Sequence, residues 1–335
     1  MNTQTTYNPT RWGILACGNI AEKFADDLVA HVPDAVVYAV ASRDLKKAQT
    51  FGERYQSTKA FGSYQELVDC PEVDVIYIAS PHAQHYEHTL LCLDAGKPVL
   101  CEKAFAINME MVSEMILKAR DKNLFLMEAI WTRFHPAIAQ TLEIIQSGQI
   151  GKIIHVAADF GFLATYDENA RLFNPSLTGG SLYDIGIYPL FISKLLLGNP
   201  KEIKALATLA PTGVDMNTSM ALNYDNGATA SLFSTFAAQT DTTCTIYGTK
   251  GKIFLHGRFH ETKGLTLQIE EEEPQFFETE RLGHGYSYEI EEVQRCLKAG
   301  MTESDKLPLQ FSLELMELLC EIRKQIGVVY PQENI

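Results

Sequence analysis

The chain has 335 residues, more than one hydrophobic core usually holds, so two domains are expected. Its composition, with 46% hydrophobic and 21% charged residues, is typical of a soluble globular protein. The net charge of −14, without a dense run of Lys or Arg, argues against nucleic acid or an anionic membrane as the main partner.

Seven cysteines are scattered along the chain without a CxxC pair, which predicts reduced thiols and no zinc site. The polar start MNTQTTYNPT lacks the apolar region of a signal peptide, and no run of about 18 apolar residues predicts a membrane span. We therefore expect a soluble cytoplasmic protein with no membrane partner.

A strand, a tight turn and a helix open the chain. Residues 11–16 form a short apolar run, and a helical pattern follows the turn. The G-x-G-x-x-G dinucleotide fingerprint survives in part, with Ala16 and Ala21 around Gly18; Ala16 suits this turn only if no positive φ is needed. A coincidental match is the alternative. Three residues are expected to approach a pyrophosphate at the helix N-terminus: Gly18, Asn19 and Ile20.

The second apolar run, residues 36–41, ends at Ser42 and Arg43. Dinucleotide-binding folds usually place an acid at this strand end for NAD, and a cation for the 2′-phosphate of NADP. Ser42 and Arg43 therefore favour NADP over NAD, while Asp44 fits the N-cap of a helix over 45–56. The alternative for Arg43 is an ordinary surface charge.

Strands and helices continue to alternate as far as residue 128. This alternation predicts a doubly wound parallel sheet, an α/β fold, in a first domain over 1–128. The further segments are a helix over 64–69, a strand over 73–79, a helix to about 95, a strand over 98–101, a helix over 108–121 and a strand over 124–127.

Three histidines follow the strand at 73–79 in three-residue steps: His82, His85 and His88. This spacing rotates them around a helix, and no acid or cysteine joins them at ligand spacing, so we expect no metal site. The better interpretation places Ser80, His82 and His85 at a helix N-terminus near the cofactor.

Glu102 and Lys103 stand where the strand at 98–101 stops. Ligands of open parallel sheets lie outside the carboxyl ends of the strands, so a lysine delivered there is held beside whatever the sheet binds. Such an amine suits a group that must meet a substrate proton. The alternative is a solvated ion pair at a strand end.

The second domain, over 129–335, changes character. We expect Trp131 and Arg133 to reach the cleft between the domains; the alternatives are an interface Trp and an Arg that caps a helix. Turn signals such as DNG at 225–227 predict hairpins in a mainly antiparallel, open α+β sheet, whose uncovered face needs a partner subunit. The expected strands cover 155–162, 202–210, 217–224, 228–237, 242–247 and 251–256.

Asp184 and Tyr188 lie four residues apart in a predicted helix that Gly179 and Gly180 introduce. They therefore share one face of that helix, where an acid and a phenol can address adjacent hydroxyls of a polyol. The alternative is a core Tyr with a capping Asp.

These elements together resemble the glucose-fructose oxidoreductase / inositol dehydrogenase (Gfo/Idh/MocA) superfamily. The resemblance rests on the strand–turn–helix at 11–21, Ser80-Pro81 with His85, Glu102-Lys103, and Gly179-Gly180 with Asp184 and Tyr188. Within it, the chain is most similar to the dimeric dihydrodiol dehydrogenases, also described as NADP-dependent D-xylose dehydrogenases. The stretches that carry this similarity are LFLMEAIWTRF at 124–134, LYDIGIY at 182–188, YGTKG at 247–251 and GYSYEIEEVQRCLKAGM at 285–301.

The resemblance implies roles for individual residues. Lys103 is similar to the catalytic lysine of the family's EKP motif, although Ala104 replaces the proline. Tyr188 stands where many members have His. Asp184 would bind substrate hydroxyls, and the substrate pocket would be lined by Trp131 and Phe160. The implied cofactor contacts are Gly18, Asn19, Ile20, Ser42, Arg43, Ser80, His82, His85, Glu102, Lys103, Trp131 and Arg133.

The implied activity is reversible hydride transfer between NADP, or less favourably NAD, and a carbinol carbon of a sugar or cyclic trans-diol, such as D-xylose or a trans-dihydrodiol. Tyr188 would accept the hydroxyl proton, and Lys103 would stabilise the developing alkoxide. A homodimer through the C-terminal sheet is expected. Two alternatives stay open: the same chemistry on an inositol or a keto- or anhydro-sugar, and a non-catalytic NADP-sensing regulator.

Overall fold

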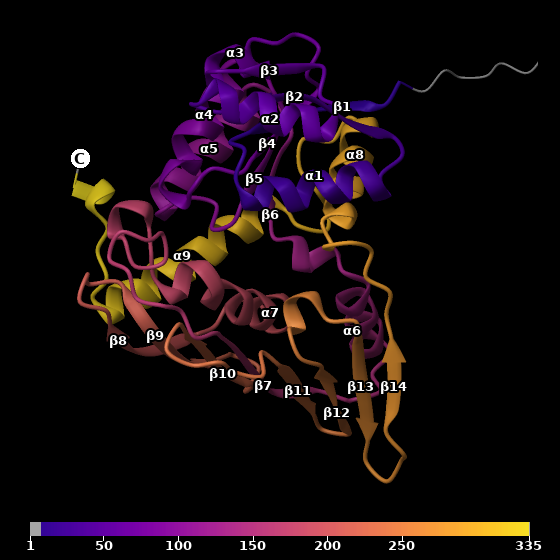
Figure 1. Ribbon diagram of the computed structural model, residues 1–335. Helices are drawn as coiled ribbons and strands as arrows, with labels where there is room; N and C mark the ends of the chain where they lie inside the picture. The colour runs from indigo at the N-terminus through magenta and orange to yellow at the C-terminus, as the bar shows by residue number, and fades with distance from the viewer. Residues whose placement is uncertain (1–7, 335) are drawn as a thin grey trace, which may run out of the picture. The chain divides into compact units, whose positions relative to one another are not determined.

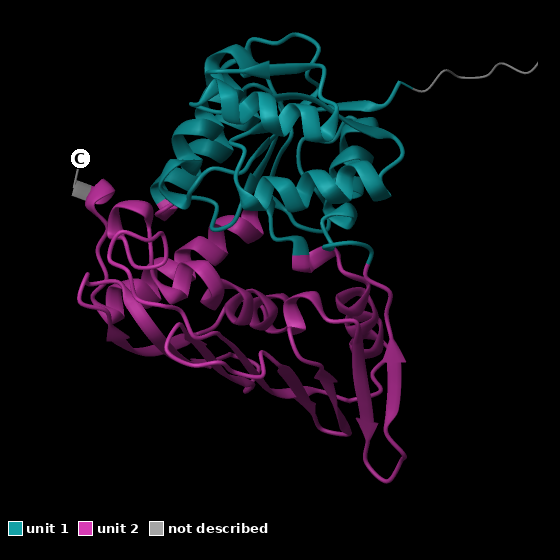
Figure 2. Cartoon of the chain, viewed as in Figure 1, with its two compact units in different colours: residues 1–106, 110–131, 282–309 teal, residues 107–109, 132–281, 310–335 magenta. Residues whose placement is uncertain are grey.

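The computed structural model describes residues 8–334 and divides the chain into two compact units (Figure 1, Figure 2). The first unit contains the residues up to 106, 110–131 and 282–309. The second contains 107–109, 132–281 and the residues from 310 onward. Each unit is built on its own β-sheet.

A six-stranded parallel sheet forms the centre of the first unit. Its strand order is β3-β2-β1-β4-β5-β6, which confirms the predicted doubly wound α/β sheet. The strand order reverses between β1 and β4, and sheets of this kind bind ligands outside the carboxyl ends of the strands at that point. The strands are β1 (Thr10–Leu15), β2 (Ala35–Ala41), β3 (Lys59–Phe61), β4 (Val75–Ile78), β5 (Val99–Glu102) and β6 (Leu126–Ala129).

Every residue of β4, β5 and β6 is buried, as expected for a parallel sheet with helices on both faces. β3 has only three half-buried residues, and no apolar run marks it in the sequence. The helices of this unit are α1 (Asn19–His31), α2 (Leu45–Tyr55), α3 (Tyr64–Val68), α4 (His85–Asp94), α5 (Met109–Asp121) and α8 (Ser287–Lys298).

The turn between β1 and α1 differs from the expectation at Ala16. Ala16 was expected to suit the turn only if no positive φ is needed there, but it has a φ of +75°. An L-residue in this left-handed region costs on the order of 1–2 kcal/mol. The amide of Ala16 donates to Ala41 O at 3.0 Å, which ties the turn to the end of β2. The prediction was therefore wrong: the turn keeps a conformation that favours glycine while an alanine occupies it.

Residues 282–309 return to the first unit after the chain has completed the second sheet. Asp27 in α1 is buried and accepts the backbone amides of His284 at 2.8 Å and Tyr286 at 2.7 Å, just before α8. Farther along, the amide of Leu126 in β6 donates to Thr302 O at 3.1 Å. These bonds explain why α8 belongs to a unit that is distant from it in sequence.

An eight-stranded sheet forms the second unit, in the order β14-β13-β12-β11-β7-β10-β9-β8. β7 and β10 pair in parallel, and the other neighbours are antiparallel, which confirms the mainly antiparallel sheet. The turn at 225–227 joins a hairpin, as predicted, and a second hairpin turns at 248–251. β13 and β14 were not predicted and flank the acidic run at 270–273. The strands are β7 (Ile153–Gly161), β8 (Glu202–Leu209), β9 (Asp215–Asn223), β10 (Thr229–Thr235), β11 (Cys244–Gly248), β12 (Gly251–Leu255), β13 (Gly264–Ile269) and β14 (Gln275–Glu278).

Helices cover one face of this sheet (Figure 1). α7 contacts β7 and β10, and α9 reaches β8, where the Gln325 side chain bonds to the backbone of Ile203 and Ala205. Ile203 and Ala205 are buried, while Lys204 between them is exposed on the other face. The helices are α6 (Pro136–Gln146), α7 (Ile187–Leu197) and α9 (Leu309–Ile326).

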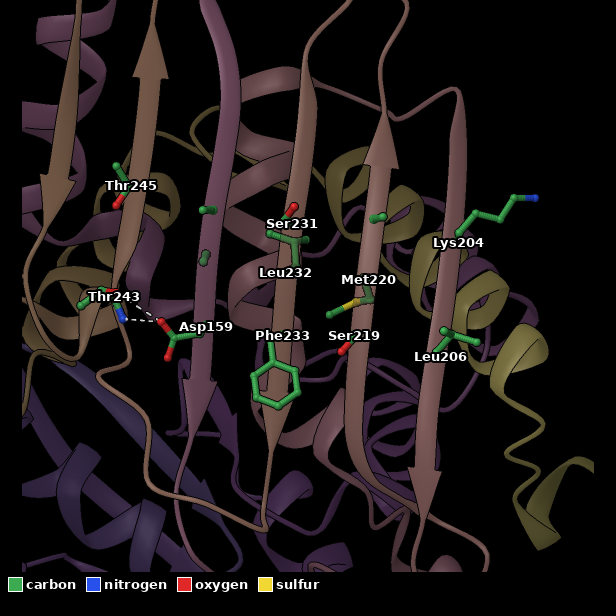
Figure 3. Close-up of a pocket in the computed structure, with 13 residues that line it drawn as sticks. Asp159, Lys204, Leu206, Ser219, Met220, Ser231, Leu232, Phe233, Thr243 and Thr245 are labelled. Carbon is green, nitrogen blue, oxygen red and sulfur yellow. Dashed lines mark hydrogen bonds between the residues drawn. The ribbon is translucent and has the colours of Figure 1, made fainter.

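The opposite face of the sheet is open across β8, β9, β10 and β7 (Figure 3). A shallow hollow of about 560 Å³ lies on it. Leu206 on this face is 81% exposed. The other lining residues are mostly small or apolar, and include Ala157, Ser219, Ala221, Ser231 and Phe233.

The seven cysteines, all within residues 8–334, are free thiols, and six of them are buried. None of the helices in that range is both long enough and apolar enough to cross a membrane.

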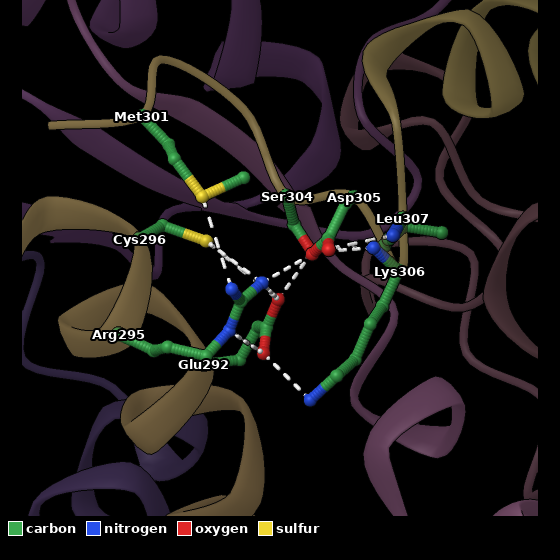
Figure 4. Close-up of polar contacts among 8 residues, drawn as sticks. All are labelled: Glu292, Arg295, Cys296, Met301, Ser304, Asp305, Lys306 and Leu307. Atoms are coloured by element: carbon green, nitrogen blue, oxygen red, sulfur yellow. Dashed lines mark hydrogen bonds and ion pairs between the residues drawn. The ribbon is translucent and has the colours of Figure 1, made fainter. Parts of the chain in front are cut away.

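Glu292 on α8 is a buried carboxylate with a full set of donors (Figure 4). It accepts hydrogen bonds from Arg295 at 2.7 Å, Lys306 at 2.8 Å and Ser304 at 2.5 Å. Burial alone would raise its pKa, but these donors lower the pKa of Glu292 to about 2.

Glu289, one turn earlier on the same helix, has the opposite environment. It is fully buried, and neither of its carboxylate oxygens has a hydrogen-bond partner. Burial raises the pKa of Glu289 well above its usual range, and the nearby carboxylates of Glu102 and Asp27 add to this effect.

These two glutamates predict opposite pH dependences of stability. Folding raises the pKa of Glu289, so the wild-type chain loses stability relative to Glu289→Gln as the pH rises above about 4.3, by at most about 1.4 kcal/mol per pH unit. Folding lowers the pKa of Glu292, so Glu292→Gln destabilises the protein at pH 7, and that deficit shrinks as the pH falls below about 4.3. Urea unfolding of the wild type and both variants between pH 2.5 and pH 8 measures the two slopes, which serve as controls for each other. If the free energies of unfolding of the two variants changed with pH in the same way, the raised pKa of Glu289 and the lowered pKa of Glu292 would be contradicted.

Candidate active site

Lys103 directly follows β5, at the carboxyl end of the parallel sheet. Tyr77 donates a hydrogen bond to Glu102 Oε1 at 2.5 Å, and the backbone amide of Lys103 donates to Glu102 Oε2 at 3.3 Å. Glu102 is only 5% exposed. The alternative of a solvated pair at a strand end does not describe Glu102. Its carboxylate is buried and accepts the backbone amide of Lys103.

His85 links the turn after β5 to the turn after β4. Its Nδ1 lies 2.8 Å from Ala104 O, and its Nε2 lies 2.8 Å from Ser80 O. Burial lowers the pKa of His85 to about 4, and the Lys103 ammonium acts in the same direction. The ring is therefore neutral at pH 7 and donates to one of the two carbonyl groups. Ala104 itself is joined to Lys103 by a cis peptide bond.

The other two histidines surround the same turn. His82 is buried against His85, with ring centroids 5.5 Å apart. His88 Nδ1 lies 2.9 Å from the hydroxyl of Ser80. Across residues 8–334, no group of three or more His, Cys, Asp or Glu side chains is arranged to hold a metal ion.

Gly18 is the N-cap of α1 and has an extended backbone with a φ of −97°. A Cβ at this position would meet no atom within 4 Å, so the space beside Gly18 is open. No side chain caps the first turn of α1, where Asn19 and Ile20 begin the helix. A pyrophosphate fits this arrangement because it would accept from the amides that a helix N-terminus leaves unpaired.

Ser42 and Arg43 follow β2. The Ser42 hydroxyl is nearly buried and accepts the Asp44 amide at 3.2 Å, while Arg43 is exposed and lies near Tyr64. Asp44 accepts the amide of Lys46 at 2.9 Å, which confirms it as the N-cap of α2. A guanidinium and a hydroxyl at this strand end are suitable for binding a 2′-phosphate.

Trp131 begins a 3₁₀ turn, η2 (Trp131–Phe134), directly after β6. Its ring stacks on Tyr286 with centroids 4.9 Å apart and planes 5° apart. Tyr286 belongs to the returning segment 282–309, so the sequence analysis missed it as the partner of Trp131. Arg133 lies in the same turn, is half-buried and belongs to the second unit.

Asp184 lies in a π-helix, η4 (Leu182–Gly186), that runs directly into α7. Asp184 and Tyr188 do lie in one continuous helical segment, as predicted, but the part that carries Asp184 has π geometry in place of α geometry. Single π-turns in helices are rare and frequently occur at functional sites.

Asp184 is 9% exposed and pairs with Arg171 at 2.8 Å. Asp184 lies inside the helical segment, whose N-cap is Ser181, and so differs from the alternative of a capping Asp. Arg171 was missed because it lies in an irregular segment before Gly179, where no periodic pattern indicates which side chains point inward.

Tyr188 lies in an aromatic cluster of the second unit together with Phe160 and His260. The rings of Phe160 and His260 stack with centroids 4.3 Å apart, and the centroids of Tyr188 and His260 are 4.9 Å apart. All three side chains are buried. His260 was missed: it lies in η5 (Phe259–Glu261), about 70 residues beyond Tyr188, and nothing local in the sequence marks it.

Two hollows of about 560 Å³ each lie elsewhere in the second unit. One is on the open sheet face, and the other borders η5, β13 and β14. Neither is lined by Asp184 or Tyr188.

Comparison with known proteins agrees with this geometry. Residues 10–130 match the model of an oxidoreductase family with an NAD-binding Rossmann fold, and residues 138–254 match the GFO/IDH/MocA C-terminal domain. Trans-1,2-dihydrobenzene-1,2-diol dehydrogenase of Mus musculus is 38% identical, over 97% of this chain and 99% of its own length. D-xylose 1-dehydrogenase (NADP(+)) of Hypocrea jecorina is 34% identical, over 96% of this chain and 93% of its own length.

Among solved structures, a 3-ketoreductase from Actinomadura kijaniata in complex with NADP and TDP-benzene is 25% identical. It aligns with a TM-score of 0.85 over 96% of this chain and 99% of its own. Both domain models match, and relatives above 30% identity extend over nearly the whole chain. The chain therefore belongs to the GFO/IDH/MocA family of oxidoreductases.

Proposed function

We propose that this enzyme is an NADP-dependent dehydrogenase that transfers a hydride between nicotinamide and a carbinol carbon of a sugar or cyclic trans-diol. The observation that carries the proposal is Lys103, whose backbone the buried Glu102 fixes at the carboxyl end of the sheet that also carries the dinucleotide turn. D-xylose and a trans-dihydrodiol are the substrates of first choice, because full-length relatives carry those names.

The cofactor would be held by the first unit, with one contact from the second. The amides at Gly18, Asn19 and Ile20 would bind the pyrophosphate, and Ser42 with Arg43 would bind the 2′-phosphate. When bound, NADP⁺ supplies the hydride acceptor. His85 would act through the carbonyl groups of Ser80 and Ala104 that it bonds. The remaining proposed contacts are Ser80, His82, Glu102, Lys103, Trp131 and Arg133.

The proton chemistry would fall to Tyr188 and Lys103. Tyr188 would accept the proton of the reacting hydroxyl, and the Lys103 ammonium would stabilise the alkoxide as it develops. Asp184 would accept hydrogen bonds from the substrate's other hydroxyls, oriented by its ion pair with Arg171. Phe160 and Trp131 would exclude water around the reacting carbon.

We further propose that residues 1–128 bind the cofactor, with Trp131 and Arg133 as additional contacts, and that the remainder of 129–335 serves substrate binding and dimerisation. The seven free thiols support a cytoplasmic location.

A direct assay tests the reaction. Purified protein with NADP⁺ or NAD⁺ and a panel of D-xylose, D-glucose, inositols and a trans-dihydrodiol is followed at 340 nm. Absorbance is expected to rise with NADP⁺ and at least one sugar or diol, and more slowly with NAD⁺. Rates in the panel also separate an inositol or other sugar from the two favoured substrates. Tight NADPH binding without any turnover would favour the alternative of a non-catalytic NADP-sensing regulator. No binding of either nucleotide would refute the whole proposal.

Two variants test the roles of Lys103 and Tyr188. Lys103→Met is expected to reduce kcat by about 100- to 1,000-fold, because the alkoxide loses its cation, while NADPH still binds. Tyr188→Phe is expected to reduce kcat by at least about 100-fold through loss of the proton acceptor. The matched controls are Lys122→Met, an exposed lysine of the first unit, and Tyr224→Phe, a buried tyrosine of the second. Near-normal turnover of either active-site variant would remove that residue from the mechanism.

We also propose a homodimer in which a second copy covers the open face of the eight-stranded sheet. Support comes from the exposed Leu206 and the small or apolar side chains around it on β7–β10. Ser231→Arg places a charge in the middle of this face and is expected to shift the mass measured by light scattering from dimer to monomer. Thr50→Arg, on the exposed surface of α2, is the control and should leave the mass unchanged. A wild-type monomer at micromolar concentration would contradict the homodimer.

A further inference from the structure

The segment that carries Asp184 and Tyr188 is held at its start by a buried carboxylate. Asp215, the first residue of β9, is fully buried. Its Oδ2 accepts three hydrogen bonds, from Ser181 Oγ at 2.7 Å, Leu182 N at 2.7 Å and Thr218 Oγ1 at 2.9 Å. Two of these donors belong to the first residues of the helical segment.

The backbone approaches Asp215 as closely as glycine permits. Gly180 has a φ of +118°, and a Cβ there would collide with Asp215 Oδ1. A Cβ on Gly186 would stand 2.8 Å from the hydroxyl of Ser234, which lies 3.0 Å from Ser181 Oγ. The backbone just before the π-helix therefore lies close to Asp215 of β9, and its last residue, Gly186, lies close to Ser234 of β10.

Asp215 is suited to hold this segment as an anion. Burial raises the pKa of Asp215 to about 6, which still leaves it ionised at pH 7, and an ionised acceptor makes stronger bonds than a neutral one. Because Asp184 lies two residues beyond Leu182 and Tyr188 follows in the same helix, a shift of Leu182 is passed on to both side chains.

We propose that Asp215 is a positioning residue for the reaction: by fixing Ser181 and the amide of Leu182, it sets where the carboxylate of Asp184 and the phenol of Tyr188 stand. This inference rests on the dehydrogenase function proposed above. Asp215 does not touch the reacting atoms, so it acts through the segment and takes no part in proton transfer.

Three variants test this role with the full-length enzyme. Asp215→Ala removes the acceptor and is expected to lower kcat/KM for the alcohol by about 100-fold, through both kcat and KM, with an unchanged Kd for NADPH. Asp215→Asn keeps a carbonyl oxygen for the three donors and is expected to rescue most of that loss. The control is Tyr224→Phe, which removes a buried hydrogen bond of 2.6 Å to Ser193 at the far end of α7. It is expected to lower stability without changing kcat or KM.

Hydrogen exchange supplies a readout that does not depend on turnover. Peptides that cover 181–188 are expected to exchange faster in Asp215→Ala than in the wild type or in Tyr224→Phe. Ser181→Ala, which removes one donor, gives an intermediate effect and replaces Asp215→Ala if thermal denaturation shows that the latter does not fold.

The outcomes separate the two proposals. Unchanged exchange at 181–188, or equal losses of kcat/KM in Asp215→Ala and Tyr224→Phe, would overturn the positioning role. If the wild type reduces neither nucleotide with any substrate, the proposed reaction fails, while faster exchange in Asp215→Ala still supports the hold of Asp215 on this segment.

Discussion

Buried carboxylates that accept backbone amides hold the functional segments of this chain in place. Asp27 accepts the amides that precede α8, Glu102 accepts the amide of Lys103, and Asp215 accepts the amide of Leu182. Removing a carboxylate from water is costly, and charge-assisted bonds to fixed amides offset that cost only when the geometry is well defined. Each of these acids therefore fixes the position of a nearby stretch of backbone, and two of them, Glu102 and Asp215, do so next to the catalytic candidates.

The parallel sheet of the first unit could be predicted because its signals are local. Apolar runs, turn residues and the position of Asp44 follow from periodicity and capping, and the hairpin at 225–227 follows from its turn sequence. β13 and β14 were missed beside the acidic run at 270–273, and β3 is too short to form a pattern. The return of 282–309 could not be predicted, since the bonds that bring it back join residues that are far apart in sequence.

The same distinction applies to the candidate site. Lys103 and Asp184 could be named because a strand end and a helical segment position them locally. Arg171 and His260 could not, because an ion pair with Asp184 and a ring stack with Phe160 exist only after distant segments meet. The conformation of Ala16 shows a further limit: its residue type argues against a positive φ, yet the turn adopts one while the Ala16 amide bonds to the end of β2.

The discontinuity of the first unit has a consequence for its synthesis. A ribosome completes residues up to 131 long before it reaches 282–309, and the whole eight-stranded sheet is made in between. During that interval Asp27 lacks the amides of His284 and Tyr286, and the amide of Leu126 in β6 lacks its later acceptor. The dinucleotide-binding unit is thus begun first but completed only after the whole eight-stranded sheet has been made, so its nascent form carries an uncovered strand edge at β6 during that interval.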